Sequence, residues 1–235
     1  MRGLWNDHGK FRIPVVNVAL LKMQWGRKAF VMITHKCAQG ELEWLQLRAG
    51  KVTASEASAL LTPLFKVSEG AGVHTYLCTK VAETFGEVLP QFSSWETEHG
   101  QILEDEARKW YAFQFDNERL HNVGFCESDD HRSGCSPDAL IGDDGGLELK
   151  CPQHTNHIRY LLDGVLPKDY VVQVHFSMFV TGRKWWKFVS YHRKFPPFVL
   201  KVDRDEAIQA KIREALTSFN AKFDAAMATV RKIAA

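Results

Sequence analysis

The sequence lacks the features that mark several classes of protein. Its 235 residues contain no apolar run approaching the roughly 18 residues that a transmembrane helix requires. The five cysteines are odd in number and include no Cys-x-x-Cys pair, which favours reduced thiols in a cytosolic setting over a disulfide framework. There is no internal repeat, low-complexity tract or P-loop, so ATP-driven translocation is not expected. The content of 45% hydrophobic and 25% charged residues is that of a globular protein and excludes a collagen, coiled-coil or wholly disordered chain.

Charge is almost balanced overall but unevenly distributed. The formal net charge is +2, yet residues 1–36 hold seven of the 30 basic residues and only one of the 28 acidic residues. Residues 37–235 are therefore mildly acidic. Any binding to nucleic acid must depend on a local basic patch and not on the overall field.

The first 36 residues read differently from the rest of the chain. The apolar stretch 13–21 follows basic residues, as in a signal peptide, but Pro14 and Asn17 interrupt it and no Ala-x-Ala cleavage site follows. A second methionine, Met32, precedes the first well-patterned helix. We therefore expect a basic extension over residues 1–36 and a single domain over residues 37–235.

Apolar periodicity and turn residues predict the order of the elements. Helices are expected over residues 41–48, from 53 or 55 to 61, and over 73–85, 98–115, 154–163, 170–181 and 204–232. Strands are expected near residues 123–126 and over 134–141, 146–151, 184–192 and 199–202. The turn at residues 142–145 joins two of these strands into a hairpin. This order predicts one central mixed sheet flanked by helices, in an α/β or α+β domain.

Two carboxylates and a lysine form the densest chemical signal. Asp138 and Glu148 lie on the two strands of the expected hairpin, so its short turn brings them together, and Lys150 shares a face with Glu148. Carboxylate oxygens and water suit Mg²⁺, which can activate a water and offset charge on a phosphoryl oxygen. A neighbouring lysine can orient or deprotonate that water. The alternative is a surface hairpin with an ordinary ion pair, but the alternation of Leu147 and Leu149 with the charged residues favours a site.

The motif resembles the PD-(D/E)XK nuclease core and, more narrowly, the lambda-exonuclease/YqaJ-type viral recombinase family. The core resemblance lies in the run from Cys135 to Asp138 and the run from Gly146 to Pro152. The resemblance continues in other blocks in the same order, which begin at Trp44, Gly100, Gln173, Val180 and Arg204. Together these blocks span about residues 41–206 and are far more specific than the core motif alone.

This resemblance implies an activity and several partners. It implies a magnesium-dependent exonuclease, with two ions and Mn²⁺ as an alternative, that degrades the 5′-ended strand of linear double-stranded DNA to mononucleotides. The 3′ single-stranded tail that remains would serve phage-type recombination beside a single-strand-annealing protein. The resemblance also implies a ring-shaped homotrimer, in the cytoplasm of a bacterial or phage-infected cell. A membrane partner is not expected.

Roles for individual residues follow from the same resemblance. Asp138, Glu148 and the Leu149 carbonyl match the metal ligands, and Lys150 matches the catalytic lysine. Glu104 matches the glutamate near the second metal, and Gln173 matches the glutamine that closes the motif. Arg48 and Ser55 match the pair that receives the 5′-phosphate.

Each of these matches has an ordinary structural alternative. Arg48 could pair with Glu41 or Glu43 on its own helix, and Ser55 could be only a helix cap. Glu104 and Arg108 could form a solvated surface pair, and Gln173 could satisfy buried backbone.

Other stretches leave further alternatives open. Relatives can place a basic residue, which wedges the two DNA strands apart, where this chain has Leu64, Phe65 and Lys66. One of these three residues or Trp95 is therefore the candidate for strand separation. The family's acidic residue before the core is either Asp129 or Asp130.

Residues 181–201 carry basic residues, including Arg183 and Lys184, among aromatic ones. This pattern is typical either of a surface that binds the DNA backbone or of a strand with one face in the core and one face exposed to solvent. The spacing of Cys151, His154 and His157 offers three ligands for zinc, one fewer than a structural site needs. Two other functions are compatible with the core: a restriction-type endonuclease, and a DNA-end-binding adaptor without turnover.

Overall fold

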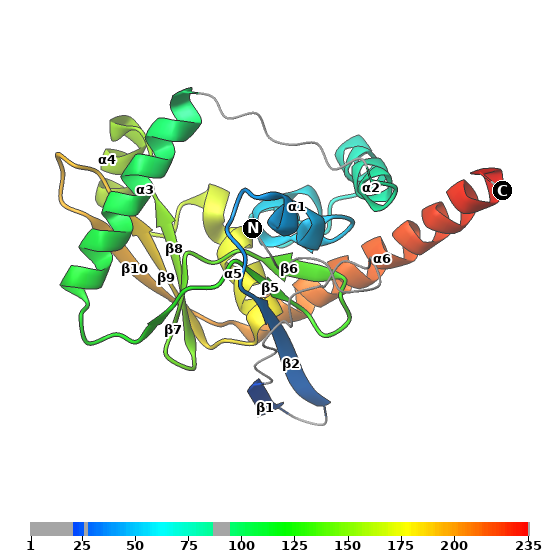
Figure 1. Cartoon of the computed structure of the whole chain (residues 1–235), viewed down its shortest axis with the longest axis horizontal. Coiled ribbons are helices and arrows are strands. Elements are labelled where there is room, and N and C mark those ends of the chain that lie inside the picture. The colour runs from blue at the N-terminus through cyan, green and yellow to red at the C-terminus, as the bar shows by residue number, and fades with distance from the viewer. Residues whose placement is uncertain (1–20, 26–27, 87–94, 235) are drawn as a thin grey trace, which may run out of the picture.

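Two five-stranded sheets and seven helical segments make up the structure, a computed structural model that describes residues 21–25, 28–86 and 95–234 (Figure 1). The first sheet has the order β1-β2-β5-β6-β3: β1 (Leu21–Trp25), β2 (Lys28–His35), β5 (Phe125–Glu127), β6 (Ser133–Cys135) and β3 (Val52–Thr53). The second has the order β10-β9-β8-β7-β4: β10 (Phe198–Asp203), β9 (Trp185–Ser190), β8 (Gly145–Lys150), β7 (Ala139–Ile141) and β4 (Leu120–His121). The helical segments are α1 (Leu42–Arg48), the 3₁₀ helix η1 (Ala54–Ala59), α2 (Ala71–Thr84), α3 (Trp95–Gln114), α4 (His154–Asp163), α5 (Lys168–Thr181) and α6 (Glu206–Ala234).

The hairpin of β7 and β8 has the expected turn and leads into a parallel crossover. Ala139 lies opposite Leu147, and β8 then pairs in parallel with β9 after a connection through α4 and α5. β8 is central and buried along almost its whole length, as strands covered on both faces are. Gly146 is required there because a Cβ on this residue would overlap the indole ring of Trp186, which is fully buried.

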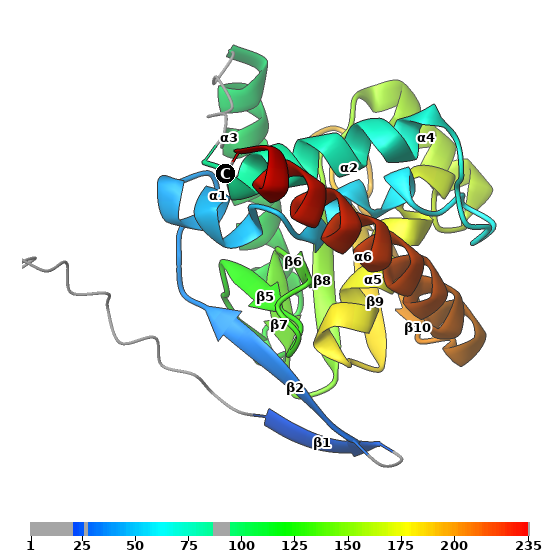
Figure 2. The ribbon, with the colours of Figure 1, turned by 90° about the vertical axis from the view of Figure 1, so that its right-hand side faces the viewer.

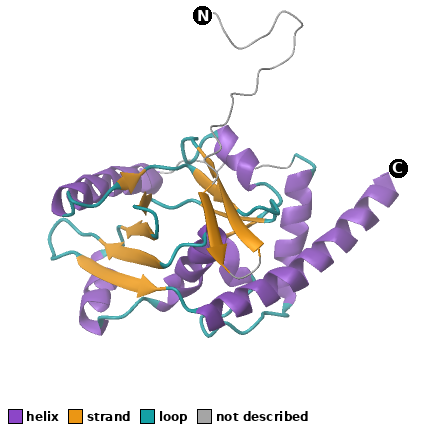
Figure 3. Cartoon of the chain, turned by 90° about the horizontal axis from the view of Figure 1, so that it is seen from below, coloured by secondary structure: helices purple, strands orange, loops and turns teal. Residues whose placement is uncertain are grey.

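Helix α5 is the central helix of the fold. It is buried on nearly every side, as its apolar sequence predicts, and it contacts both sheets as well as η1 and α6. α6 presents one apolar stripe that includes Ile212, Leu216 and Phe219, and packs it against α2 and α5 (Figure 2). Viewed from below, the strands form an inner layer with helices around them (Figure 3). The distal end of α6 extends away from this body (Figure 1).

Two expectations about the sheets need correction. The single strand expected over residues 134–141 is two strands in different sheets, because Ser136, Pro137 and Asp138 lead the chain out of β6 and into β7. The single central sheet is consequently two sheets. A short irregular segment of this kind carries no periodicity of its own, so the sequence pattern on either side appears continuous.

The expected boundary after residue 36 is placed too far along the chain. Ile33, Thr34 and His35 pair with β5, and Met32 is 3% exposed in the main core. Residues 32–35 therefore belong to the domain, and residues 1–20 lie outside the described part of the chain. None of the five cysteines forms a disulfide bond in the structure. In the part of the chain that is described, no helix has both the length and the apolar character needed to cross a membrane.

Candidate active site

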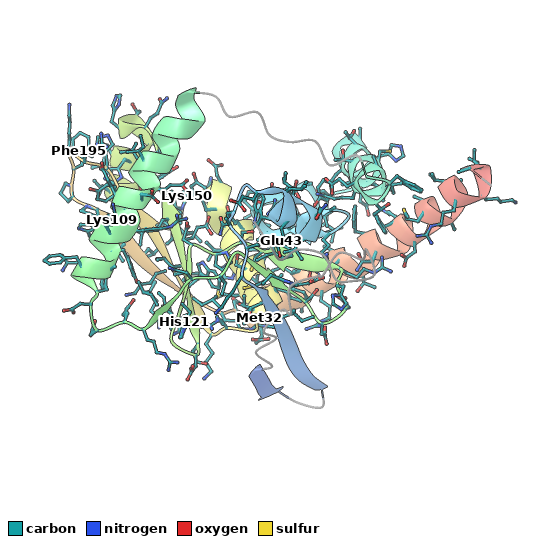
Figure 4. All side chains as sticks on the ribbon, viewed as in Figure 1. Met32, Glu43, Lys109, His121, Lys150 and Phe195 are labelled. Carbon is teal, nitrogen blue, oxygen red and sulfur yellow. The ribbon has the colours of Figure 1, made fainter. Side chains whose placement is uncertain are left out.

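The end of the β7–β8 hairpin brings together the two carboxylates, the lysine and the glutamine that were predicted. Glu148 Oε1 accepts hydrogen bonds from Lys150 Nζ at 2.6 Å and from Gln173 Nε2, also at 2.6 Å. Asp138 directly precedes β7, and its Oδ2 accepts from the Leu149 backbone N–H at 2.7 Å. Gln173 thus binds a carboxylate and not buried backbone. In Figure 4 the labelled Lys150 lies at the end of β8, beside α3.

Burial and like charge make this cluster electrostatically unusual. Glu148 is 3% exposed, and burial raises its pKa to about 7, although Lys150 opposes the shift. Glu104 has a raised pKa as well, through burial and then through the charge of Asp138, and its helix α3 packs against β8. Burial disfavours the charged form of Lys150, but Glu148 outweighs it and raises the pKa of Lys150. Three carboxyl groups and one ammonium therefore share a small, poorly solvated volume.

Arg108 is a member of the site that was not predicted. Its Nη2 donates to Asp138 Oδ1 at 2.8 Å, so it reaches the hairpin and does not form a surface pair with Glu104. The i,i+4 spacing of Glu104 and Arg108 placed both on one face of α3, but only the packing of α3 on β8 shows that this face covers the site.

Tyr170 is a second such residue. Its ring lies under Lys150, with Nζ 5.3 Å from the ring centroid, a distance at which the cation and the ring attract each other. Tyr170 precedes Gln173 by three residues on α5, so one helical turn supplies both contacts to the Glu148–Lys150 pair. That spacing is the signal in the sequence from which Tyr170 could have been found.

The donor set fits a hard divalent cation. Asp138 and Glu148 present carboxylate oxygens from the two hairpin strands, Glu104 adds a third nearby carboxyl, and the repulsion that raises the pKa of Glu104 is what a cation would relieve. Among the residues that the structure describes, no three His, Cys, Asp or Glu side chains gather tightly enough to hold a metal by themselves. Mg²⁺ is usually held by one or two carboxylates and keeps several waters, so it needs few protein ligands.

Arg48 and Ser55 lie together in a second cluster next to the hairpin. Arg48 Nη2 donates to Ser55 Oγ at 3.2 Å and to Thr53 Oγ1 at 3.1 Å. The guanidinium stacks on Trp44, 4.3 Å from the ring centroid. Arg48 therefore does not use the alternative partners on its own helix. Ser55 is exposed and could meet a ligand, whereas Thr53 is fully buried.

Trp44 connects this cluster to the hairpin. Its indole N–H donates to Ser136 Oγ at 2.8 Å, two residues before Asp138, and Gln39 Nε2 donates to the Pro137 carbonyl at 3.1 Å. α1 and the segment before it are thereby fixed to the loop that carries Asp138. The cation of Arg48 and the carboxylates consequently form neighbouring parts of one site.

The three candidate wedge residues in the tight turn at residues 62–66 differ in how far their side chains are exposed. Leu64 is 80% exposed at its tip and Lys66 is also exposed, whereas Phe65 packs on the core with its ring 5.5 Å from that of His175. Leu64 is thus the better placed of the two apolar residues to insert into DNA. The side chain of Trp95 lies outside the described residues.

The basic stretch 181–201 is largely engaged within the protein. Arg183 is 3% exposed and donates to the carbonyl oxygens of Ile141, Gly142 and Gly145, so the expected DNA contact does not fit its position. Lys184 is exposed but pairs with Asp144 at 2.9 Å, near the opposite end of β8 from Lys150. Its role as a DNA contact stays a prediction.

Two further alternatives concern residues outside the cluster. His157 is fully buried, with Nδ1 2.7 Å from Ser190 Oγ and Nε2 3.0 Å from the Pro196 carbonyl oxygen, so it is a core histidine and not a zinc ligand. Asp130 accepts from Ser128 Oγ and the Arg132 N–H in the β5–β6 turn, so its carboxylate stabilises that turn.

Comparison with known proteins identifies the family. The sequence model of the YqaJ-like viral recombinase domain matches residues 43–184. The alkaline exonuclease LHK-Exo from Laribacter hongkongensis has 29% sequence identity and a TM-score of 0.72, covering 83% of this chain and 98% of its own. LHK-Exo in complex with dAMP gives the same values. A phage-related exonuclease from Haemophilus somnus 129PT is similar in fold, with 14% identity and a TM-score of 0.59 over 77% of this chain and 96% of its own.

A search of curated proteins finds no match. The family match and the structural neighbours agree with the hairpin geometry, in which an aspartate, a glutamate and a lysine meet at one end of the central strands. The chain belongs to the YqaJ-like viral recombinase domain family, with the PD-(D/E)XK nuclease fold of the lambda-exonuclease type.

Proposed function

We propose that this nuclease of phage-type recombination is an exonuclease of linear double-stranded DNA that degrades the 5′-ended strand and releases mononucleotides. The observation that carries the proposal is the adjacency of two parts of the site: the Asp138–Glu148–Lys150 cluster and the Arg48–Ser55 cluster, which Trp44 connects. A cation that receives a terminal phosphate beside a hydrolytic centre is what an enzyme that starts at a 5′ end requires. The description of LHK-Exo as an alkaline exonuclease, at 29% identity, supports the same activity.

The residues of the chain have distinct tasks in this reaction. Arg48 would fork onto the oxygens of the terminal 5′-phosphate, and the Ser55 hydroxyl would donate to them. Water attacks the next phosphorus, and the bond to the 3′ oxygen of the terminal nucleotide breaks, which releases a 5′-mononucleotide. Lys150 would orient that water. Glu148 and Tyr170 hold the Lys150 side chain in place, and the hydrogen bond from Gln173 keeps Glu148 turned toward the site.

A bound Mg²⁺ would supply Lewis-acid activation of water and offset negative charge on the phosphoryl group. Asp138, Glu148 and the Leu149 carbonyl are the residues proposed to hold it, with Glu104 near a second ion and Mn²⁺ as an alternative metal. We further propose a homotrimer, a single-strand-annealing protein as partner, and a cytoplasmic location. Light scattering that finds only monomer at micromolar concentration would contradict the trimer.

The test is a time course of hydrolysis with Mg²⁺ on three substrates. Two are linear duplexes that are blocked at one end and carry a 5′-phosphate at the open end, with the label either on the strand whose 5′ end lies there or on the strand whose 3′ end lies there. The third is a closed circular duplex. The proposal expects mononucleotides from the 5′-ended strand of linear DNA only, and none from Asp138→Ala. Asp163→Ala, a substitution at the exposed end of α4, is the matched control and should retain activity. Loss of the 3′-ended strand would overturn the polarity, cutting of the circle would indicate an endonuclease, and binding without hydrolysis would indicate an adaptor.

A further inference from the structure

Lys80 on α2 is a buried cation between two carboxylates. Its side chain is 3% exposed, and Nζ lies 2.9 Å from Glu56 Oε2 and 3.0 Å from Glu83 Oε1. Tyr76 lies beside this group, with its ring centroid 5.2 Å from Nζ and its hydroxyl donating to Glu56 Oε2 at 3.3 Å. A buried lysine is costly unless it is paired, so the arrangement must stabilise something that the fold or the function needs.

Both carboxylates hold the segment that carries the phosphate-binding residues. Glu56 Oε2 accepts from Thr53 Oγ1 at 2.7 Å, and Glu83 Oε2 accepts from the Gly50 backbone N–H at 2.8 Å. Residues 50–56 contain Ser55 and begin two positions after Arg48. Lys80 thus holds, through two carboxylates, the two ends of the segment that carries Ser55.

Arg48 itself is bound by hydroxyl groups, and no carboxylate among the described residues forms an ion pair with it. Burial lowers the pKa of Arg48, and Glu56 is the first of the charges that oppose this. The carboxylate of Glu56 is separated from the guanidinium by a single hydroxyl, because Thr53 Oγ1 contacts both groups. The charge of Arg48 is therefore stabilised from a short distance but is not neutralised by direct contact.

We propose that Lys80 is a positioning residue that keeps Glu56 and Glu83 away from Arg48, so that the guanidinium stays available to a 5′-phosphate. The inference rests on the proposed function, since it assigns to Lys80 the selection of phosphorylated ends. Without Lys80, two carboxylates lose their cation, and Arg48 is a neighbouring cation whose charge both of them favour. The Glu56 side chain is 38% exposed and so has room to turn toward it. A direct Arg48–Glu56 pair would then compete with the phosphate.

The experiment measures DNA binding without divalent cations, so that it does not depend on catalysis. The dissociation constants of one duplex with a 5′-phosphate and with a 5′-hydroxyl end are compared by fluorescence anisotropy. Wild type should prefer the phosphate, and Lys80→Met should reduce that preference by roughly 10-fold or more, the worth of one charge-assisted hydrogen bond, while binding of the hydroxyl end is unchanged. Lys187→Met, which removes another largely buried lysine paired with Glu118, should keep the preference.

A double variant separates the proposed role from a general loss of structure. K80M/E56Q removes the competing carboxylate and should regain most of the preference. If K80M does not fold, the charge-balanced K80Q/E83Q leaves Glu56 free and should also lose the preference. A preserved preference in either folded variant overturns the inference, as does equal weakening of both ends that E56Q does not reverse. Failure of the proposed function is distinct, because it appears as absent hydrolysis by the wild type, whatever these binding ratios are.

Discussion

Replacement of His157 by phenylalanine should destabilise the protein through two lost hydrogen bonds. The imidazole is fully buried, and its Nε2 must carry the hydrogen because the Pro196 carbonyl can only accept. In the neutral ring, Nδ1 then accepts from the Ser190 hydroxyl at 2.7 Å. Phenylalanine keeps a ring next to His192 and Phe195 but bonds to neither polar group.

The magnitude follows from where the two partners lie. Ser190 is fully buried and would be left without an acceptor, which costs about 1–3 kcal/mol, whereas the Pro196 carbonyl lies in an exposed residue and water can replace the ring. We therefore expect a loss of about 1–3 kcal/mol in the free energy of unfolding. For a chain of this size, that lowers Tm by roughly 2–12 °C.

The assay is thermal unfolding with and without a chelator, with His154→Ala as control. His154 lies three residues earlier on α4 and is exposed, so its replacement should leave Tm nearly unchanged. If His157 belonged to a zinc site with Cys151 and His154, both variants and chelator treatment would lower Tm by similar amounts. That pattern, or an unchanged Tm for H157F, would refute the reasoning.

Two further predictions concern the sheets and the pH dependence of stability. Gly146→Ala should lower the free energy of unfolding by about 1–3 kcal/mol and lower the rate of hydrolysis, because the new Cβ overlaps the buried Trp186 ring. Gly72→Ala, where the Cβ meets open space, is the control in thermal unfolding and activity assays. Equal Tm values for the two variants would contradict the prediction. Burial raises the pKa of Glu127. The charge of Lys51 and the hydrogen bonds that the Glu127 carboxylate accepts outweigh this effect and hold the pKa below 4.5. The carboxylate therefore stabilises the fold above about pH 4.5, and this stability is lost as the pH falls through the folded pKa, so acid unfolding of Glu127→Gln should depend less steeply on pH.

The β7–β8 hairpin could be predicted because its determinants are local. The turn at residues 142–145 sets the register, and alternation in β8 places Leu147 and Leu149 opposite in direction to Glu148 and Lys150. The apolar stripe of α6 and the apolar character of α5 on all sides can likewise be predicted from the sequence of each helix alone. These features depend on neighbours within a few residues, so the pattern alone was sufficient.

Contacts between distant segments could not be read in the same way. Arg108 reaches Asp138 across 30 positions, and Lys80 meets Glu56 across 24, although nothing in their local sequence distinguishes them from surface residues. Arg183 looked like a DNA contact because it lies among basic and aromatic residues, yet the close approach of β7 and β8 offers it three carbonyl groups inside the protein.

The sequence by itself therefore determined the nuclease core, its family and the identity of the four residues that meet at the end of β8. The tertiary structure decided that the chain divides into two sheets at Asp138, and that residues 32–35 are part of the domain. It also decided which charges are buried and which partners they have. The physical reason is that register and periodicity are properties of neighbouring residues, whereas burial and ion pairing depend on which distant segments pack together.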